Sequence, residues 1–375
     1  MGIIFHSSPE PTLGVEVELQ IVDLKTRQLV SVAPQILKNF QDNPHVKPEL
    51  LQSTIELNTG ICKDVGEVRR DLKNLMDQIQ PICDDLGCAL ISAGTHPTAV
   101  WPEQAITDNQ RYRQLVDRVQ WPAQRLMIFG LHVHVGINSP EKAIALFNAL
   151  SGYIPHLLAV SASSPFWQGN DTGLASVRVK VFETLPTAGL PYRMLNWGEF
   201  QRFMNTLVAA RAIETIREVW WDIRPHPGFG TVELRMCDGI PTMTELVSVV
   251  ALSHCLVVWL SQKYDEGDML RLDRHWVIRE NKWRAARWSL DASIIVDDQG
   301  NQETISRSLE GLMGTLGPIS EQLNCRKELE GIRRIVDSGP SYQRQRGIYR
   351  KTGRFEPVVD ALIEEWRTDR RVRSV

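Results

Sequence analysis

The chain has 375 residues, of which 43% are hydrophobic and 23% are charged, and its formal net charge is −3. These values are ordinary for a folded globular protein, and the lack of a basic excess argues against a nucleic-acid partner or an anionic membrane surface. Six cysteines lie apart in the sequence without a CxxC pair. Reduced thiols in the cytoplasm are therefore the simplest expectation, and no signal peptide is expected before the first strand.

Alternation of apolar and polar residues predicts six strands. In the first, residues 13–21, the apolar side chains share one face. Glu16 and Glu18 share the other face, with α-carbons roughly 7 Å apart. The other five strands are predicted at residues 49–59, 88–93, 128–137, 176–182 and 231–237. The fold class that follows is α+β, with helices packed on one face of an antiparallel sheet and the other face open to water or a ligand.

Helices are predicted where apolar residues recur at spacings of three and four. They cover residues 68–86, 139–158, 199–219, 244–262, 275–288, 304–323 and 358–367. The chain is expected to be helical from about residue 241, and the apolar run 246–260 is too short to span a bilayer comfortably. Loops are predicted at 163–173, 220–230 and 339–353, the last of them basic, and the final few residues are expected to be disordered. No linker interrupts residues 1–375, so a single domain is expected.

The polar faces of the predicted strands carry acids and histidines on some strands and cations on others. The set comprises Glu16, Glu18, Glu56, His132, His134, Arg178, Lys180, Glu233 and Arg235. Carboxylates and imidazole suit magnesium or manganese, and arginines suit phosphate oxygens. A strand histidine alone is usually only hydrogen-bonded, and a strand arginine alone is usually ion-paired. Their joint occurrence predicts a metal–nucleotide site for phosphoryl transfer.

The proline-rich loop 220–230 directly precedes the strand of Glu233. Its prolines stiffen the connection, so Arg224 could be aimed as a fork at a substrate carboxylate. A surface ion pair between Arg224 and Asp222 explains the same residues equally well. Both interpretations stay open at this point.

Four motifs resemble the glutamate–cysteine ligase type 2 family, and most closely its YbdK-type carboxylate–amine ligase branch. They lie at residues 13–19, 130–136, 171–176 and 230–235, in the family's order and over nearly the whole chain. The resemblance implies a glutamine-synthetase-like antiparallel sheet. Its concave face would hold ATP and two or three magnesium ions, with manganese as the alternative.

The resemblance also assigns roles to individual residues. Glu16 and Glu18 match a pair of metal ligands, His132 matches a further ligand, and Glu233 resembles a carboxylate shared between metals. Arg235 resembles the arginine on the transferred phosphoryl group.

Further residues around these positions are carried over in the same way. Glu56 resembles a metal ligand on the second strand, and Arg224 resembles a glutamate-binding arginine. His134, Arg178 and Lys180 are candidates for contacts with the nucleotide. Glu49 belongs to the acidic pair with Glu56, but a regular strand would point it to the opposite face, so a bulge or turn near Leu50 would be needed.

The activity implied by the resemblance is ATP-dependent amide formation through an acyl phosphate, with ADP and phosphate released. Glutamate and cysteine, giving γ-glutamylcysteine, are the expected substrates; another carboxylate–amine pair stays open, and a homodimer is compatible with the sequence. A guanidino-kinase-like phosphotransferase is a further alternative, because Cys237 would share a strand face with Arg235. A non-catalytic nucleotide sensor is disfavoured because the acids and the arginine are all retained.

Overall fold

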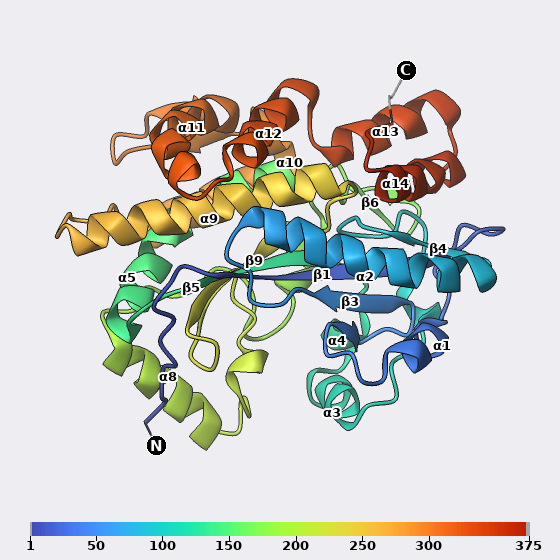
Figure 1. Ribbon diagram of the computed structural model, residues 1–375, viewed down its shortest axis with the longest axis horizontal. Coiled ribbons are helices and arrows are strands. Elements are labelled where there is room, and N and C mark those ends of the chain that lie inside the picture. The colour runs from blue at the N-terminus through green and yellow to red at the C-terminus, as the bar shows by residue number, and fades with distance from the viewer. Residues whose placement is uncertain (1, 373–375) are drawn as a thin grey trace.

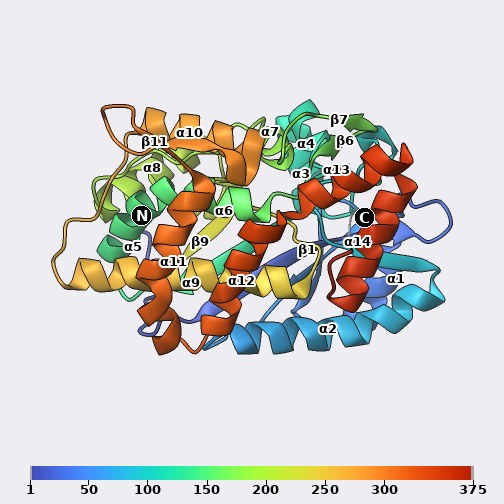
Figure 2. The ribbon, with the colours of Figure 1, turned by 90° about the horizontal axis from the view of Figure 1, so that it is seen from above.

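A seven-stranded sheet lies at the centre of the computed structural model, which describes residues 2–372 (Figures 1 and 2). The strand order is β2-β3-β1-β5-β9-β8, with β4 also paired to β1, and every pairing in this sheet is antiparallel. The strands are β1 (Leu13–Asp23), β2 (Val46–Pro48), β3 (Thr54–Asn58), β4 (Cys88–Ile91), β5 (Gly130–Gly136), β8 (Ile223–His226) and β9 (Thr231–Asp238). The predicted α+β class and the antiparallel sheet are confirmed.

Helices cover one face of this sheet, with a first layer against the strands and further helices above that layer (Figure 1). The first layer is α2 (Val65–Asp85), α5 (Pro140–Leu150), α6 (Ile154–Ser161) and α9 (Met243–Asp265). Further helices are α10 (His275–Trp288), α11 (Ile305–Gln322), α12 (Arg326–Ser338), α13 (Ser341–Thr352) and α14 (Glu356–Thr368). The alternating apolar residues of β1, β3, β5 and β9 bury themselves against the first layer, which accounts for the main core.

The opposite face of the sheet carries smaller elements, of which α3 (Gln110–Val119) and α4 (Trp121–Gln124) lie below β3 in Figure 1. Further elements of the chain include α1 (Ala33–Leu37), β6 (Phe166–Trp167), β7 (Asn170–Asp171), α7 (Arg178–Phe182), α8 (Trp197–Ala209), the 3₁₀ turn η4 (Ile216–Glu218), β10 (Ser293–Ile295) and β11 (Gln302–Thr304). Among the described residues, two stretches, Pro140–Ser161 and Met243–Asp265, are long and apolar enough to cross a membrane, but 78% and 83% of the most apolar 18-residue window of each is buried inside the protein. They are core helices here, as expected for residues 246–260.

The predicted strand at 176–182 is wrong, because α7 occupies residues 178–182. The sheet position next to β9 is taken instead by β8, which lies inside the predicted loop 220–230. Pro225 fits there because β8 is an edge strand, where a missing backbone N–H is tolerated.

The basic loop predicted at 339–353 is also wrong, since α13 covers residues 341–352. No apolar stripe marks this helix, because its buried face includes Arg344, paired with Glu245 and Glu365 at 2.8 and 2.7 Å. The helix predicted at 199–219 ends at Ala209. The disorder expected for the last few residues concerns 373–375, which lie outside the described residues.

Candidate active site

The polar face of the sheet is hollowed into a cavity of about 420 Å³. Its floor is formed by β1, β3, β5, β8 and β9, and its walls include Tyr112 and Leu115 of α3 and Arg217 and Glu218 of η4. Nearly all of the acids, histidines and arginines singled out in the sequence line this one cavity. The exceptions are Glu233, which is fully buried and pairs with the lining residues Arg224 and Arg235, and Lys180.

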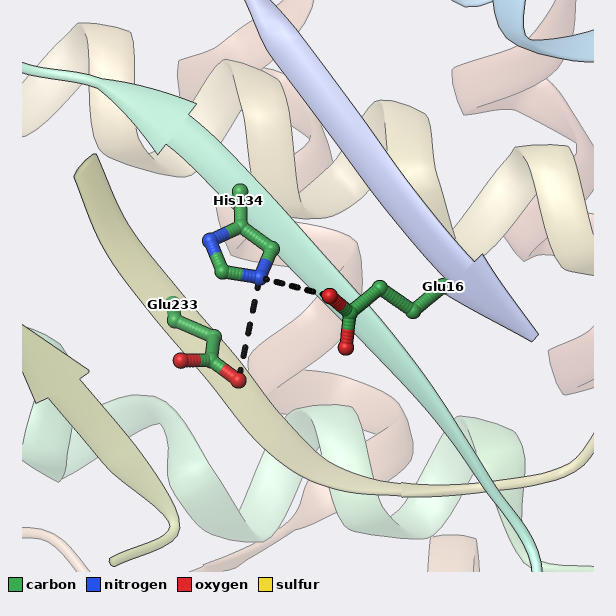
Figure 3. A group of neighbouring side chains, drawn as sticks. All are labelled: Glu16, His134 and Glu233. Atoms are coloured by element: carbon green, nitrogen blue, oxygen red, sulfur yellow. Dashed lines mark ion pairs between the residues drawn. The ribbon is translucent and has the colours of Figure 1, made fainter. Parts of the chain in front are cut away.

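Glu16, His134 and Glu233 form a compact group on three neighbouring strands, shown in Figure 3 and named here the histidine cluster. Nε2 of His134 lies 3.6 Å from an oxygen of Glu16 and 3.7 Å from an oxygen of Glu233. The other ring nitrogen, Nδ1, is 3.0 Å from the hydroxyl of Thr231, which fixes the ring. Within residues 2–372, Nε2 has no hydrogen-bond partner although it is buried. A nitrogen held in this way between two carboxylates suits a divalent cation.

Glu18, Glu49 and Glu56 form a second group, named here the carboxylate cluster. One oxygen from each carboxylate lies within 4.8 Å of the others. Glu49 reaches the cluster because the chain turns between β2 and β3. A bulge or turn near Leu50 was the condition that the sequence set for Glu49 to join Glu56. Its backbone is held there by the Thr107 hydroxyl, which donates to the Glu49 carbonyl at 2.5 Å.

Burial and mutual repulsion disfavour ionisation of the three acids in the carboxylate cluster, and a bound cation would offset this repulsion. Burial and the neighbouring charges of Glu56 and Glu18 raise the pKa of Glu49 well above its usual range. Burial and the charge of Glu16 raise the pKa of Glu56 to about 7, against a hydrogen bond of 2.8 Å from Asn58. Three acids that oppose one another's ionisation and offer only oxygens fit a hard cation such as magnesium or manganese.

His132 lies between the two clusters. Its Nδ1 is 3.0 Å from Glu16, and its Nε2 is 4.0 Å from Glu18. Burial, followed by the nearby Arg235, lowers the pKa of His132, which favours the neutral ring that metal ligands need. Burial would raise the pKa of Glu16, but the hydrogen bond with His132 and the nearby His134 ring outweigh it and lower that pKa far below its usual range.

Arg235 lies beside the histidine cluster, where its guanidinium pairs with Glu233. The register of β9 shifts against β5 at this point, so that Leu234 is opposite Val133 while Cys237 is opposite Leu131. This bulge reverses the alternation after Arg235 and turns Cys237 toward the helices, with its Sγ 3.8 Å from the carbonyl of Leu157. Burial raises the pKa of the Cys237 thiol to about 12. The expectation that Cys237 shares a face with Arg235 is wrong, and the guanidino-kinase alternative loses its cysteine.

Arg224 is a residue of β8 and not of a loop, and its side chain is almost fully buried. Its Nε and Nη2 bind one oxygen of Glu233 at 2.8 and 2.7 Å. Its Nη1 donates to the carbonyls of Ile216 and Val219 at 2.8 and 3.1 Å. The guanidinium fork therefore faces Glu233 and η4, and the surface pair with Asp222 is not formed.

Arg178 and Lys180 separate because they belong to a helix and not to a strand. Arg178 is buried and lines the cavity, where its Nη atoms donate to the Arg235 carbonyl at 3.3 and 3.4 Å. Lys180 lies outside the cavity lining and pairs with Glu183. The alternation in residues 176–182 predicted that both side chains lie on one face of a strand. In the helix α7, residues two positions apart point in different directions.

Several residues of the cavity wall were not singled out in the sequence. They include Lys47, Arg111, Tyr112, Arg217, His226 and Phe229. His226 stacks on Phe229 with ring centroids 4.1 Å apart, and both rings contact the edge of His134. For His226, the signal in the sequence was its position two residues after Arg224, which places both side chains on one face of a strand. The proline-rich composition of residues 220–230 predicted a loop and concealed this pattern.

Comparisons with known proteins agree with the resemblance seen in the motifs. Residues 12–361 match the model of glutamate-cysteine ligase family 2. A protein of Frankia alni provisionally named glutamate–cysteine ligase 2-1 is 48% identical over 379 residues, covering 99% of both chains.

Solved structures show the same fold at low sequence identity. A glutamate–cysteine ligase of Francisella tularensis in complex with AMP superposes with a TM-score of 0.74 at 11% identity, over 99% of this chain and 91% of that one. A bifunctional glutathione synthetase of Pasteurella multocida gives a TM-score of 0.67 at 14% identity, over 96% of this chain and 51% of that one. The match over nearly the whole sequence shows that the chain belongs to glutamate-cysteine ligase family 2.

Proposed function

We propose that this protein uses ATP to join a carboxylate to an amine through an acyl phosphate, with glutamate and cysteine as the substrates. The products would be γ-glutamylcysteine, ADP and phosphate. The observation that carries the proposal is the grouping of two acidic clusters with the buried Arg178 and the partly buried Arg235 around one cavity. Acid-bound cations beside arginines are the arrangement that phosphoryl transfer from a nucleotide requires.

The chemistry explains why such a site is needed. A carboxylate is a poor electrophile, and phosphorylation of one of its oxygens turns that oxygen into a good leaving group. The γ-phosphoryl group passes to the carboxylate with its charge spread over three oxygens, so catalysis depends on positioning and charge neutralisation. The amine then attacks the acyl carbon and phosphate leaves.

The chain's own residues divide this work between them. The histidine cluster and the carboxylate cluster would hold magnesium or manganese ions, which neutralise the phosphates of bound ATP. Glu233 is held rigidly by Arg224 on one oxygen and by Arg235 on the other. Arg235 would face the growing charge on the transferred group, and Arg178 would bind a neighbouring phosphate oxygen.

Arg111, Lys47 and Arg217 also line the cavity, are solvent-exposed, and are named here the cationic rim. Within residues 2–372 none of the three forms an ion pair shorter than 4.0 Å, in contrast to Arg224. We therefore assign the carboxylates of the amino-acid substrates to this cationic rim, and a supporting role behind Glu233 to Arg224.

The test is product analysis with purified protein, ATP, magnesium and a mixture of amino acids. ADP should form only when glutamate and cysteine are present, in step with a product of the mass of γ-glutamylcysteine. Glu233→Gln is the matched control and should make neither. Pyrophosphate released in step with product would refute the acyl-phosphate route, whereas ADP with a different conjugate would retain the route and replace the substrates.

A further inference from the structure

Arg178 is a buried arginine without an acidic partner. Its side chain is 2% exposed, and within residues 2–372 no carboxylate lies within 4.0 Å of its nitrogens. Its Nη atoms reach only the carbonyl of Arg235, at 3.3 and 3.4 Å, and its Nε has no acceptor. A buried cation is normally paired, because desolvation of an unpaired charge is costly. Some other feature of the fold must hold this guanidinium in place.

The guanidinium lies directly on the backbone of β5 at Gly130. A Cβ added to Gly130 would be 2.2 Å from Nη2 and 2.8 Å from Cζ of Arg178. The amide of the same glycine donates to the carboxylate of Glu18. A side chain at this position would therefore push the Arg178 guanidinium away from its place against β5.

Asp238, at the end of β9, fixes the chain that leads into α7. Its carboxylate accepts hydrogen bonds from the Ser163 amide at 2.9 Å, the Ser164 hydroxyl at 2.6 Å and the Ser176 hydroxyl at 2.8 Å. The Ser164 hydroxyl in turn accepts from the backbone amide of Arg178 at 3.1 Å. All of these groups are fully buried, so the hydrogen bonds are shielded from water.

A second glycine makes room for this carboxylate. A Cβ on Gly94 would lie 2.6 Å from Cγ of Asp238 and 2.9 Å from Cβ of Ser164. The far end of the segment is held separately, because Arg346 binds Asp171 through two nitrogens and Arg287 donates to the carbonyl of Gly173. Both ends of the 171–176 motif are thus fixed. The motif therefore holds the start of α7, a role that the metal site does not explain.

We propose that Asp238 is a positioning residue for Arg178. Through Ser164 and Ser176 it locks the start of α7, and the gap at Gly130 then lets the guanidinium face a phosphate oxygen of the bound nucleotide. This inference rests on the proposed function, which supplies the anion. Within residues 2–372, the hydrogen-bond partners of the Asp238 carboxylate include no residue of the two acidic clusters.

The experiment is a double-mutant cycle between Asp238→Asn and Arg178→Ala, read by kcat, by KM for ATP and by melting temperature on the same preparations. A displacement of about 1 Å at a reacting group costs on the order of 10²-fold in rate, and Asp238→Asn should lose that much kcat/KM. In the Arg178→Ala background the same substitution should cost less than about twofold, because no guanidinium is left to position. Losses that multiply would overturn the proposal, as would normal turnover in Asp238→Asn.

Gly130→Ala displaces Arg178 without removing it. It should lower kcat/KM about as much as Arg178→Ala, and the double variant should be no slower than Arg178→Ala alone. A further loss in the double variant would overturn the role given to the glycine gap. Glu365→Gln is the matched control, since it neutralises another buried carboxylate, 2.7 Å from Arg344 and outside the cavity lining. It should lower the melting temperature and leave turnover per folded molecule unchanged.

Binding of a non-hydrolysable ATP analogue with magnesium separates this inference from the proposed function. Arg178→Ala should weaken that binding roughly tenfold or more, and Asp238→Asn should add nothing to the loss. If the two variants show coupled losses of analogue binding while the wild type forms no γ-glutamylcysteine, the amino-acid substrates are rejected and the positioning role is kept. If the wild type forms γ-glutamylcysteine but the binding losses of the two variants are independent, the positioning role is rejected and the proposed function is kept.

Discussion

Replacement of Arg224 by methionine separates a substrate-binding arginine from a supporting one. A fork that binds substrate should be free on its outer nitrogens, so its loss would raise KM and leave the fold intact. The structure instead commits the guanidinium to one oxygen of Glu233 and to the carbonyls of Ile216 and Val219. Methionine keeps much of the length and volume, so the substitution removes mainly the hydrogen bonds and the charge.

The expected loss of stability follows from these contacts. Glu233 is fully buried, and without Arg224 one of its oxygens and the Val219 carbonyl lose their donors, while the Ile216 carbonyl still accepts from the Val219 amide. Each unsatisfied buried group costs about 1–3 kcal/mol, and breaking a buried ion pair costs about 3–5 kcal/mol. Because Arg235 still pairs with Glu233, we expect a total of about 4 kcal/mol. At roughly 2 cal/mol/K of unfolding entropy per residue, this lowers the melting temperature of a chain of this length by roughly 5 °C.

The assay combines urea unfolding, calorimetry and steady-state kinetics on one preparation. Arg224→Met should unfold at lower urea and require more magnesium, because Glu233 is no longer held in the histidine cluster. Arg224→Lys should recover little, since a single ammonium cannot bind the carboxylate and both carbonyls together. A variant as stable as the wild type, with only the KM for glutamate raised, would refute this reasoning and restore the fork as a substrate contact.

Four further predictions follow from the same geometry. Arg235→Ala should lose on the order of 10³-fold in turnover while the affinity for ATP changes by roughly tenfold or less, as measured by calorimetry; near-normal turnover would exclude its role in the transition state. Glu49→Gln should raise the magnesium concentration for half-maximal activity at least roughly tenfold, and an unchanged magnesium titration would remove Glu49 from the metal site. Lys180→Ala should retain the ATP affinity of the wild type, since Lys180 lies outside the cavity lining; a tenfold loss would reinstate the nucleotide contact expected from the sequence. Burial lowers the pKa of His96 and of His156 to about 4, so the unfolded chain binds these protons first as pH falls below about 6.5, and stability measured by urea unfolding should fall between pH 6.5 and 4 by on the order of 3 kcal/mol per histidine. Flat stability over that range would contradict their burial as neutral rings.

The sheet could be predicted from the sequence where strands alternate over long stretches. β1, β5 and β9 are long, have one apolar face, and were found within a few residues of their bounds. β8 is four residues long and contains Pro225, so neither length nor composition marks it as a strand. Residues 176–182 show the reverse error, because three alternating valines satisfy a strand pattern as well as they satisfy a buried helical turn.

The shared face of the metal-site candidates was predictable for the same reason, since period-two alternation places Glu16, His134 and Glu233 together, but the sequence assigned His134 to the nucleotide and His132 to the metal. The tertiary details were not predictable. The turn that brings Glu49 into the carboxylate cluster depends on the Thr107 contact, which is 58 residues away in the sequence. The bulge that turns Cys237 away from Arg235 is a single extra residue, and one residue reverses every later side chain on a strand.

The charges of the cavity are arranged with a direction along the sheet. At the β3 side, Glu18, Glu49 and Glu56 lie together and, within residues 2–372, have no lysine or arginine nitrogen within 4.0 Å; the neutral His132 ring approaches only Glu18, at 4.0 Å. At the β9 side, the single acid Glu233 is bound by two arginines. A chain of phosphates with its metal ions has one favourable orientation on such a face, with metal ions on the acids and uncoordinated phosphoryl oxygens toward the arginines. The carboxylate cluster must therefore bind its cation before or together with ATP, because bare acids would repel the phosphates. Magnesium should for this reason lower the apparent Kd for ATP as well as raise kcat, and an ATP affinity that is independent of magnesium would contradict this charge arrangement.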